Sequence, residues 1–501
     1  MIALAALLLF VFVAYPAHAR PGALRLAVVA TLAAVITSYF WFPFLLYQDY
    51  LSASQYLERW KYDSFGAIDV LTRLLDGGLL DSGRLPVLTV LLALGVAWSV
   101  VSSNPDARMA LAVFVVCLLL YFGRATWGTL ADLVPMHQGL LFHRFIGGVH
   151  LGAILLIGIG GEWLWQRFSG FSNPWRSLLP GLIVSILMLP ALKERFDFYS
   201  LEARSMKKTR VALDTDADWR SILDEVKRLP PGRTYAGFRS NWGAKVTLGD
   251  IHFFDLLPFY DITMLGPPYE GLSLNSDVVQ HFSELDPTHY DLFDVEYVIA
   301  PSNQNMPRFL TPIRKTSRYT LYRANTSGYG AVARSVVSKS ADSQATLLKG
   351  NKSWLTFGVG LGQFIRWSYP AAEETGASAS APPPLVPARG TVRDQRIGPG
   401  LIELQVDARD EALLVVKTSY HPKWSVKVDG RDADFFMVSP SYIGLNIPAG
   451  VHHVRLEYRS GILKEVLLFL GAATLLATVL ARRKFERINE LINAMSKSNG
   501  G

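Results

Sequence analysis

Residues 26–46 read LAVVATLAAVITSYFWFPFLL, a stretch of 21 positions without a charged side chain, and this stretch decides the fold class. A helix of that length crosses about 30 Å, which is the thickness of the hydrocarbon core of a bilayer. Half of the 501 residues are hydrophobic and only 18% are charged, whereas an average soluble protein has about 25% charged residues. The sequence therefore predicts a membrane protein rather than one large soluble core.

Further apolar runs surround this stretch, and together they predict about six transmembrane helices in residues 1–192. Arg108 and Arg124 stand at the two ends of the run 109–123, where long basic side chains reach the headgroups. The other runs are residues 2–18, 85–101, 109–123, 145–165 and 178–192, and a last transmembrane helix is expected within 461–481.

Lysine and arginine give the predicted orientation. If the helix at 26–46 runs outward, every short inner connection is basic, as the positive-inside rule requires. The tail 482–501 has five basic and two acidic side chains, which gives +3, and it would lie in the cytoplasm. The outer loops 47–84 and 124–144 and the whole block 193–460 are then extracytoplasmic.

Net charge and cysteine content exclude other classes of protein. The net charge of +7 is explained by basic residues next to the membrane, so the expected partner is the lipid bilayer and not nucleic acid. Cys117 is the only cysteine, so the chain has no internal disulfide framework and no cysteine-based zinc finger.

The block 193–460 predicts two folded parts and a linker. Residues 193–370 alternate helix and strand patterns and indicate an α/β domain, with an amphipathic helix at 218–229. Residues 371–396 are rich in Ala, Ser and Pro, which is typical of a solvated linker or loop. Residues 397–460 contain about five short strands and the hairpin-turn pair Asp429–Gly430, and they predict a β-sandwich before the last helix.

Several motifs in the later part of the chain resemble one family. SYHPKW at 419–424, VDG at 428–430, IPAGVH at 447–452 and VRLEY at 454–458 are followed by the terminal helix. This series resembles the C-terminal region of the YfhO-type bacterial membrane proteins, which are related to the polyprenyl-phosphate-dependent glycosyltransferases of the GT-C fold. Residues 290–300, 319–322 and 38–46 resemble earlier parts of the same group.

The resemblance implies a membrane glycosyltransferase, or the C-terminal portion of one, in the bacterial inner (plasma) membrane. It would transfer a sugar from a polyprenyl-phosphate donor to a cell-envelope acceptor, so the implied partners are a lipid-linked sugar and an envelope glycan. GT-C enzymes carry acidic catalytic residues in the outer loop after their first helix. Here the stretch 2–18 leads inward, so no loop matches, and we expect the chain to be the C-terminal part of a longer protein.

Two questions about chemistry stay open at this level. No motif specifies a cofactor, although the resemblance leaves a divalent metal ion open. The alternative to an enzyme is a non-catalytic envelope protein whose extracytoplasmic domain binds glycan or a partner protein.

The candidate site residues lie in and next to the predicted outer loops. Arg124, His137, His143 and Arg144 surround the second outer loop at the depth of a lipid-linked phosphate, and Arg and His suit phosphate oxygens. The alternative is that the two arginines only reach from helix ends to the headgroups. His150 is an ionisable residue within the span 145–165, and such residues are often functional.

Asp49 follows the helix at 26–46 and is the one weak candidate for a catalytic acid; solvation of a helix end is the alternative. In the same loop, residues 64–75 place Phe65, Ile68, Leu71 and Leu75 on one face. This spacing predicts an amphipathic helix that lies on the membrane interface.

Overall fold

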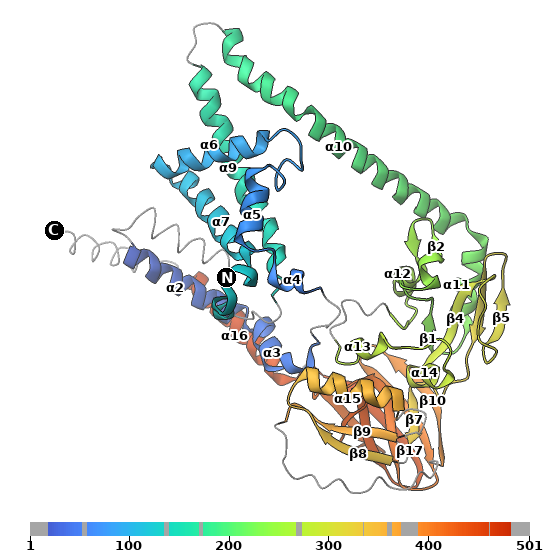
Figure 1. The fold of residues 1–501 in the computed structure, drawn as a ribbon. Coiled ribbons are helices and arrows are strands. Elements are labelled where there is room, and N and C mark those ends of the chain that lie inside the picture. Colours follow the sequence, from blue (N-terminus) through green and yellow to red (C-terminus); the bar gives the residue numbers. More distant parts are fainter. Residues whose placement is uncertain are drawn as a thin grey trace. The chain divides into compact units, whose positions relative to one another are not determined.

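The polypeptide forms two compact units, each built from segments that are distant in the sequence, and each is described by itself (Figure 1). Unit 1 comprises Met1–Pro43, Leu57–Ser200 and Leu463–Gly501, and unit 2 comprises Phe44–Tyr56 and Leu201–Ile462. The structure is a computed structural model, and it describes residues 19–52, 58–134, 140–169, 174–266, 273–333, 335–357, 363–371, 389–459 and 461–481.

Unit 1 is helical. Three of its described helices are long and apolar enough to cross a membrane, or four if a bent pair counts as one span. Its elements are α2 (Ala19–Ile36), α3 (Ser38–Leu46, which continues into unit 2), α4 (Arg59–Asp63), α5 (Ala67–Leu75), α6 (Val87–Val101), α7 (Pro105–Phe122), α8 (Arg124–Trp127), η3 (Gly128–Leu133), η5 (Phe142–Phe145), α9 (Ile146–Ser169), the first part of α10 (Pro174–Thr215) and α16 (Ile462–Leu480).

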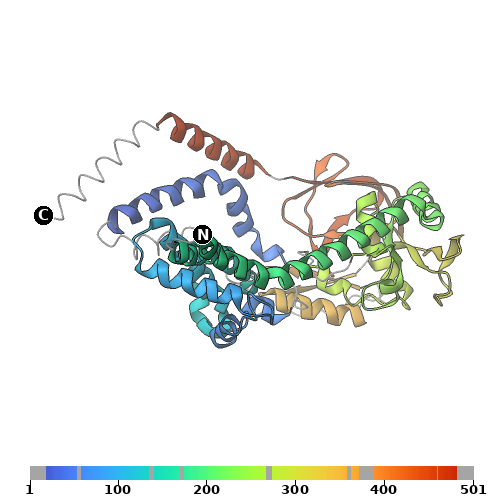
Figure 2. The same cartoon turned by 90° about the horizontal axis from the view of Figure 1, so that it is seen from above.

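The stretch 26–46 is not the single straight helix that its composition predicts. It is bent by 73° between α2 and α3, at Thr37, as Figure 2 shows. Two side chains satisfy helix carbonyls at the bend: Thr37 Oγ1 donates to Ala33 O (2.7 Å), and Trp41 Nε1 donates to Ala34 O (2.9 Å). Hydropathy alone misses the bend because side chains satisfy these carbonyls within an apolar run.

Two other predicted spans also differ from the expectation, and a third is not described. The run 85–101 forms α6, which has only 15 residues. The run 178–192 belongs to α10, a helix of 42 residues that continues past the predicted start of the outer block at 193 and ends at Thr215 (Figure 1). The predicted span 2–18 lies outside the described residues, as does the basic tail 482–501.

Helices α6, α7 and α9 pack with their backbones in contact. A Cβ atom at Gly95 would lie 1.9 Å from Leu156 O, and a Cβ atom at Gly160 would lie 2.1 Å from Leu91 O. A Cβ atom at Gly152 would lie 2.7 Å from Phe114 Cα of α7. Only residues without a side chain permit such an approach, which is the usual way in which apolar helices gain contact area in lipid.

Unit 2 contains three main sheets. A four-stranded sheet has the order β1-β4-β6-β5, a five-stranded sheet β10-β11-β17-β13-β14, and a six-stranded sheet β7-β12-β16-β15-β9-β8. The strands are β1 (Arg233–Tyr235), β4 (Val295–Pro301), β5 (Thr311–Lys315), β6 (Tyr319–Arg323), β7 (Gly330–Ala333), β8 (Ser335–Ser340), β9 (Gln363–Ser368), β10 (Gly390–Gly398), β11 (Leu401–Ala408), β12 (Ala412–Ser419), β13 (Trp424–Val428), β14 (Arg431–Asp432), β15 (Phe436–Val438), β16 (Tyr442–Ile447) and β17 (Gly450–Tyr458); a small hairpin adds β2 (Thr247–Leu248) and β3 (Ile251–His252).

Short helices complete unit 2, and one of them confirms a sequence prediction. Helix α11 (Ala217–Arg228) buries Trp219, Ile222, Leu223 and Val226, as the amphipathic pattern at 218–229 predicts, and Asp216 caps it by accepting from Trp219 N. The others are α12 (Phe253–Leu256), α13 (Ser276–Val279), α14 (Pro287–Leu292), α15 (Gln344–Phe357), η6 (Trp242–Lys245) and η7 (Leu257–Tyr260).

Strand β12 belongs to two hydrophobic cores at once. Leu413 and Val415 join the core that the four-stranded sheet and its helices share with the six-stranded sheet. Leu414 and Val416 point the opposite way, into the core between the five- and six-stranded sheets. Because both faces are covered, the strand is a continuous apolar run rather than an alternating one.

The predicted domain boundaries differ from the observed ones because pairing partners come from distant parts of the sequence. Strands β7, β8 and β9 lie within the predicted α/β region but pair in the six-stranded sheet of the sandwich. Strand β10 begins at Gly390, inside the predicted linker 371–396, and pairs along β11. The predicted turn at Asp429–Gly430 is confirmed: both residues have positive φ (50° and 79°), and they join β13 to β14.

Candidate functional site

Two segments of unit 1, which the sequence predicts as outer loops, fold onto the helices as one layer. This loop layer consists of the described residues 58–84, 123–134 and 140–145, and it contains α4, α5, α8, η3 and η5. Its buried members, among them Val70, Ala131 and Phe142, share a core with α7 and α9. Gly123 has φ of 63°, and a Cβ atom there would lie 2.2 Å from Asp63 O, so glycine allows the two segments to meet.

The loop layer brings together three of the predicted phosphate-binding residues. Arg124 is the first residue of α8, and its guanidinium lies 5.4 Å from the ring of Phe142 in η5. His143 and Arg144 are the next two residues of η5. His137, the fourth predicted member, lies outside the described residues.

Arg124 and His143 are held by neighbours in the layer. Arg124 Nη2 lies 3.7 Å from Asp132 Oδ1, and 22% of the Arg124 side chain is exposed. The Nδ1 atom of His143 lies 2.6 Å from Lys61 O; a carbonyl only accepts, so Nδ1 carries the proton and Nε2 is the free ring nitrogen. The His143 ring also meets the ring of Trp60 edge-on at 5.1 Å.

Arg144 differs from its two neighbours because it is exposed. Among the described residues it forms no ion pair. Its guanidinium carries five N–H donors in a fork whose geometry suits an anion at this surface.

His150 is not part of this group. It lies on α9, one turn beyond η5, and its Nε2 atom contacts Leu79 O at 3.3 Å. The contact joins α9 to the segment between α5 and α6.

The predicted amphipathic helix is α5, and its apolar face is free. Ile68, Leu71 and Leu75 are 86%, 40% and 78% exposed, whereas Val70 on the other side is fully buried. The exposed face has the spacing predicted for a helix on a membrane interface.

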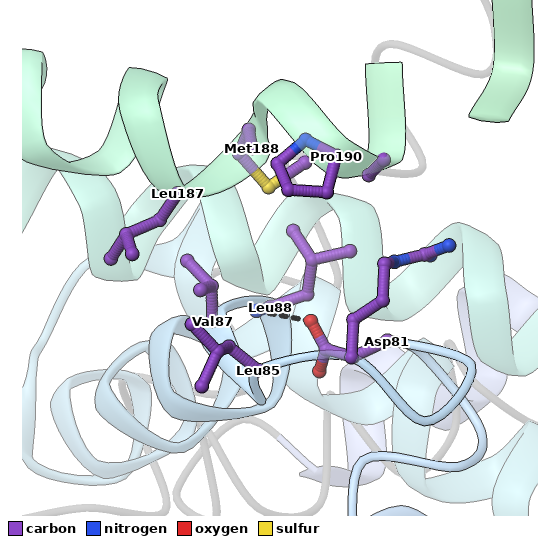
Figure 3. A pocket seen from close by; sticks show the side chains of 9 residues that line it. Asp81, Leu85, Val87, Leu88, Leu187, Met188 and Pro190 are labelled. Atoms are coloured by element: carbon purple, nitrogen blue, oxygen red, sulfur yellow. Dashed lines mark hydrogen bonds between the residues drawn. The ribbon is translucent and has the colours of Figure 1, made fainter. Parts of the chain in front are cut away.

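Asp81, another carboxylate of this loop, has a structural role. Its two oxygens accept from Leu88 N (2.9 Å) and Thr89 N (3.0 Å) at the start of α6. It lies beside a small cavity of about 40 Å³ in unit 1, lined by α6 and α10 residues such as Leu187 and Met188 (Figure 3). With its lone pairs used as a helix cap, Asp81 does not serve as a free acid or base.

Asp49, the weak catalytic candidate, lies in unit 2 on the short helix η2 (Gln48–Tyr50). Its backbone carbonyl accepts from Tyr369 Oη at 2.7 Å and from Gln344 Nε2 at 3.2 Å, while the residue itself is exposed. Burial, and then the neighbouring Tyr420 and Asp49, raise the pKa of Tyr50 to about 12. The phenol of Tyr50 therefore stays protonated at physiological pH beside Asp49.

The SYHPKW motif holds this segment to the sandwich. The ring of His421 lies 5.0 Å from that of Tyr47, 5.4 Å from Tyr50 and 5.5 Å from Tyr458. Burial, and secondly Lys423, lower the pKa of His421 to about 4, so the ring is neutral at physiological pH and packs among aromatic rings. Lys423 Nζ lies 4.5 Å above the Tyr47 ring. The motif that carries the family resemblance therefore has a structural function.

Unit 2 contains a buried charge cluster that was not predicted from the sequence. Lys417 Nζ contacts Asp291 Oδ1 (3.1 Å) and Ser327 Oγ (2.8 Å), and only 2% of the lysine is exposed. Arg233 donates to Phe293 O and Lys417 O, and its guanidinium lies 4.8 Å from the Tyr329 ring. Asp294 is fully buried, and its Oδ2 atom has no hydrogen-bond partner. The available signal was a lysine directly after the apolar run 413–416.

No resident metal site is apparent among the described residues, since none of their His, Cys, Asp and Glu side chains form a group of three that could hold an ion. Comparison of the chain with family models, with curated proteins and with solved structures finds no match.

Proposed function

We propose that the chain is a GT-C-related membrane glycosyltransferase, or the C-terminal part of one, that acts on a polyprenyl-phosphate-linked sugar and an envelope acceptor. The observation that supports this proposal is the group of Arg124, His143 and Arg144 in the loop layer of unit 1. The group lies next to α7 and α9, which are long and apolar enough to cross a membrane. The phosphate of a lipid-linked sugar lies at that depth in a bilayer.

Each of the three side chains has a distinct part in binding the phosphate. Arg144 is exposed and offers a guanidinium fork that matches phosphate oxygens. Lys61 O fixes the ring of His143 through Nδ1, which leaves Nε2 to form one hydrogen bond with the phosphate group. Arg124 is placed by Phe142 and Asp132 and adds positive charge beside them. The three groups bind and orient; the proposal assigns no bond-breaking step to them.

The experiment is a binding and transfer assay with the full chain in nanodiscs. Arg144→Ala should weaken binding of a polyprenyl phosphate roughly tenfold to a hundredfold, since a hydrogen bond to a charged group contributes about 1.5–3 kcal/mol. Lys193→Ala is the matched control: this cation of unit 1 has a side chain that is 78% exposed, and it pairs only within its own helix with Asp197.

Two results would contradict the proposal. The first is equal affinity of wild type, Arg144→Ala and Lys193→Ala for the polyprenyl phosphate. The second is unchanged envelope glycosylation in a deletion strain together with glycan binding by the full chain, which would favour the non-catalytic envelope protein. The assay uses the full chain because Asp49 and Leu51 belong to unit 2, where they accept hydrogen bonds from Tyr369 and Gln344.

A further inference from the structure

An apolar groove lies between the bent helix pair α2–α3 and α16 in unit 1. Its volume is about 280 Å³, and it is open on one side. Residues from α2, α3 and α16 line it: Thr31, Ala34, Val35, Ser38, Trp41, Phe42, Leu467 and Leu470. The groove is independent of the loop layer, and none of the residues discussed for the proposed function belongs to it.

One polar group in this groove lacks a partner. Ser38 is only 7% exposed, and its hydroxyl oxygen has no hydrogen-bond partner in the structure. In a regular helix a serine hydroxyl usually bonds to the carbonyl four residues earlier. Here that carbonyl, Ala34 O, accepts from Trp41 Nε1 instead. A buried hydroxyl without a partner costs free energy, so an acceptor in the groove would be favourable.

The depth of the groove indicates which acceptor is available. Leu467 and Leu470 lie five and eight residues after Ile462, the first residue of α16, which is about 8–12 Å along a helix. The interfacial region on each side of a bilayer is about 5–8 Å thick, so this end of the groove lies near the boundary of the hydrocarbon core. Trp41, at the same end, is a residue type enriched at that boundary. Ester carbonyls of glycerolipids lie there.

The remaining walls of the groove suit a hydrocarbon chain. Thr31 lies seven residues before Ser38 on the helix pair, which is about 10 Å deeper along α2. Val35 and Leu470 are apolar, and α16 is only 6% buried within the protein, so its surroundings are lipid when it spans a membrane.

We propose that this groove binds one acyl chain of a bilayer glycerolipid, with the ester carbonyl of that chain accepting a hydrogen bond from Ser38 Oγ. The hydroxyl selects an ester-linked lipid over a hydrocarbon chain without a carbonyl, such as a polyprenyl chain. The lipid would fill the space between the bent helix pair and α16.

The experiment measures quenching of tryptophan fluorescence in the full chain by phospholipids with brominated acyl chains. The Trp41 component is the part of the fluorescence quenching that is present in wild type and absent in Trp41→Phe. Ala34→Phe fills the groove from α2 and should remove this component, whereas Ala33→Phe, one residue away and outside the lining, should leave it. Leu467→Trp fills the groove from α16 and should reduce the number of retained lipids in native mass spectrometry by one; Leu468→Trp is its control.

Ester-linked and ether-linked lipids then test the hydrogen bond. Wild type should bind the ester lipid about twofold to tenfold more tightly, because one neutral hydrogen bond contributes about that much. Ser38→Ala should bind both lipids equally. Equal quenching in Ala34→Phe and wild type, no ester preference in wild type, or tighter binding of polyprenyl phosphate would each overturn the proposal. Lipid binding to the groove only after removal of residues 1–18 would also overturn the proposal. All these readouts are independent of transferase activity.

Discussion

The two units differ in what they bring into contact when they fold. In unit 1, glycines let backbones touch: Gly160 approaches Leu91 O so closely that a methyl group would not fit. In unit 2, side chains of opposite charge are buried together, with Lys417 2% exposed and Asp294 fully buried. In lipid, apolar helices gain little free energy from excluding water, so close packing of their backbones supplies the stabilisation instead. In unit 2 water is excluded, so buried charges must have partners.

The largest effect should come from removing the buried cation of unit 2. Lys417→Met removes the positive charge that contacts Asp291, whose side chain is 45% exposed, and that lies near the fully buried Asp294. We expect the free energy of unfolding to fall by about 3–5 kcal/mol because Asp294 stays buried without this charge. Denaturant unfolding of the full chain measures it. Lys427→Met is the control, since Lys427 and Asp432 form an exposed pair at 3.7 Å and should contribute about 0–1 kcal/mol. Equal losses in both variants would show that burial is not the cause.

The second effect concerns pH and Asp294. Burial is the main cause that raises the pKa of Asp294 from 3.8 to about 6. The folded state then binds the proton more tightly than the unfolded chain, so this group adds stability as the pH falls from above 6 towards 4. A pKa difference of about two corresponds to about 3 kcal/mol.

Asp294→Asn isolates this contribution. The free energy of unfolding of Asp294→Asn minus that of wild type should be about 3 kcal/mol smaller at pH 4 than at pH 8. The pKa of Asp291 shifts in the opposite direction. Burial raises this pKa, but Lys417 and Ser327 lower it more, so that it lies below 3.8 overall. The difference between Asp291→Asn and wild type should therefore stay constant from pH 8 to pH 4 and change only below that range. A flat profile for Asp294→Asn would refute the burial argument.

The smallest of the three effects tests helix packing in unit 1. Gly160→Ala places a Cβ atom 2.1 Å from Leu91 O, so α6 and α9 must separate, at a cost of about 1–3 kcal/mol. Gly161→Ala, with no atom within 4 Å of the added carbon, should be neutral or stabilise by up to about 1 kcal/mol through helix propensity. Thermal unfolding in detergent compares the two, and a loss in Gly161→Ala of the same size would contradict the packing argument.

The candidate site shows how far sequence reasoning reaches. Arg124, His143 and Arg144 were predicted as one group because they are close in the chain, and the structure places them in one layer. Lys61, which accepts from His143 through its backbone carbonyl, is 82 residues away and was not predicted. Neither was the pairing of Lys417 with Asp291, which are 126 residues apart. Nothing in local periodicity tells which distant loop will pack against another.

The sequence by itself determined the elements whose signal is local. The period of apolar residues defined the helix at 217–228, the pair Asp429–Gly430 defined a hairpin turn, and uncharged runs defined the helices that are apolar enough for a bilayer. Only the tertiary structure decided the bend at Thr37, the membership of β7–β9 in the sandwich and the attachment of residues 44–56 to unit 2. The physical reason is that each of these depends on contacts between distant residues, which compete with alternatives that satisfy the local pattern equally well.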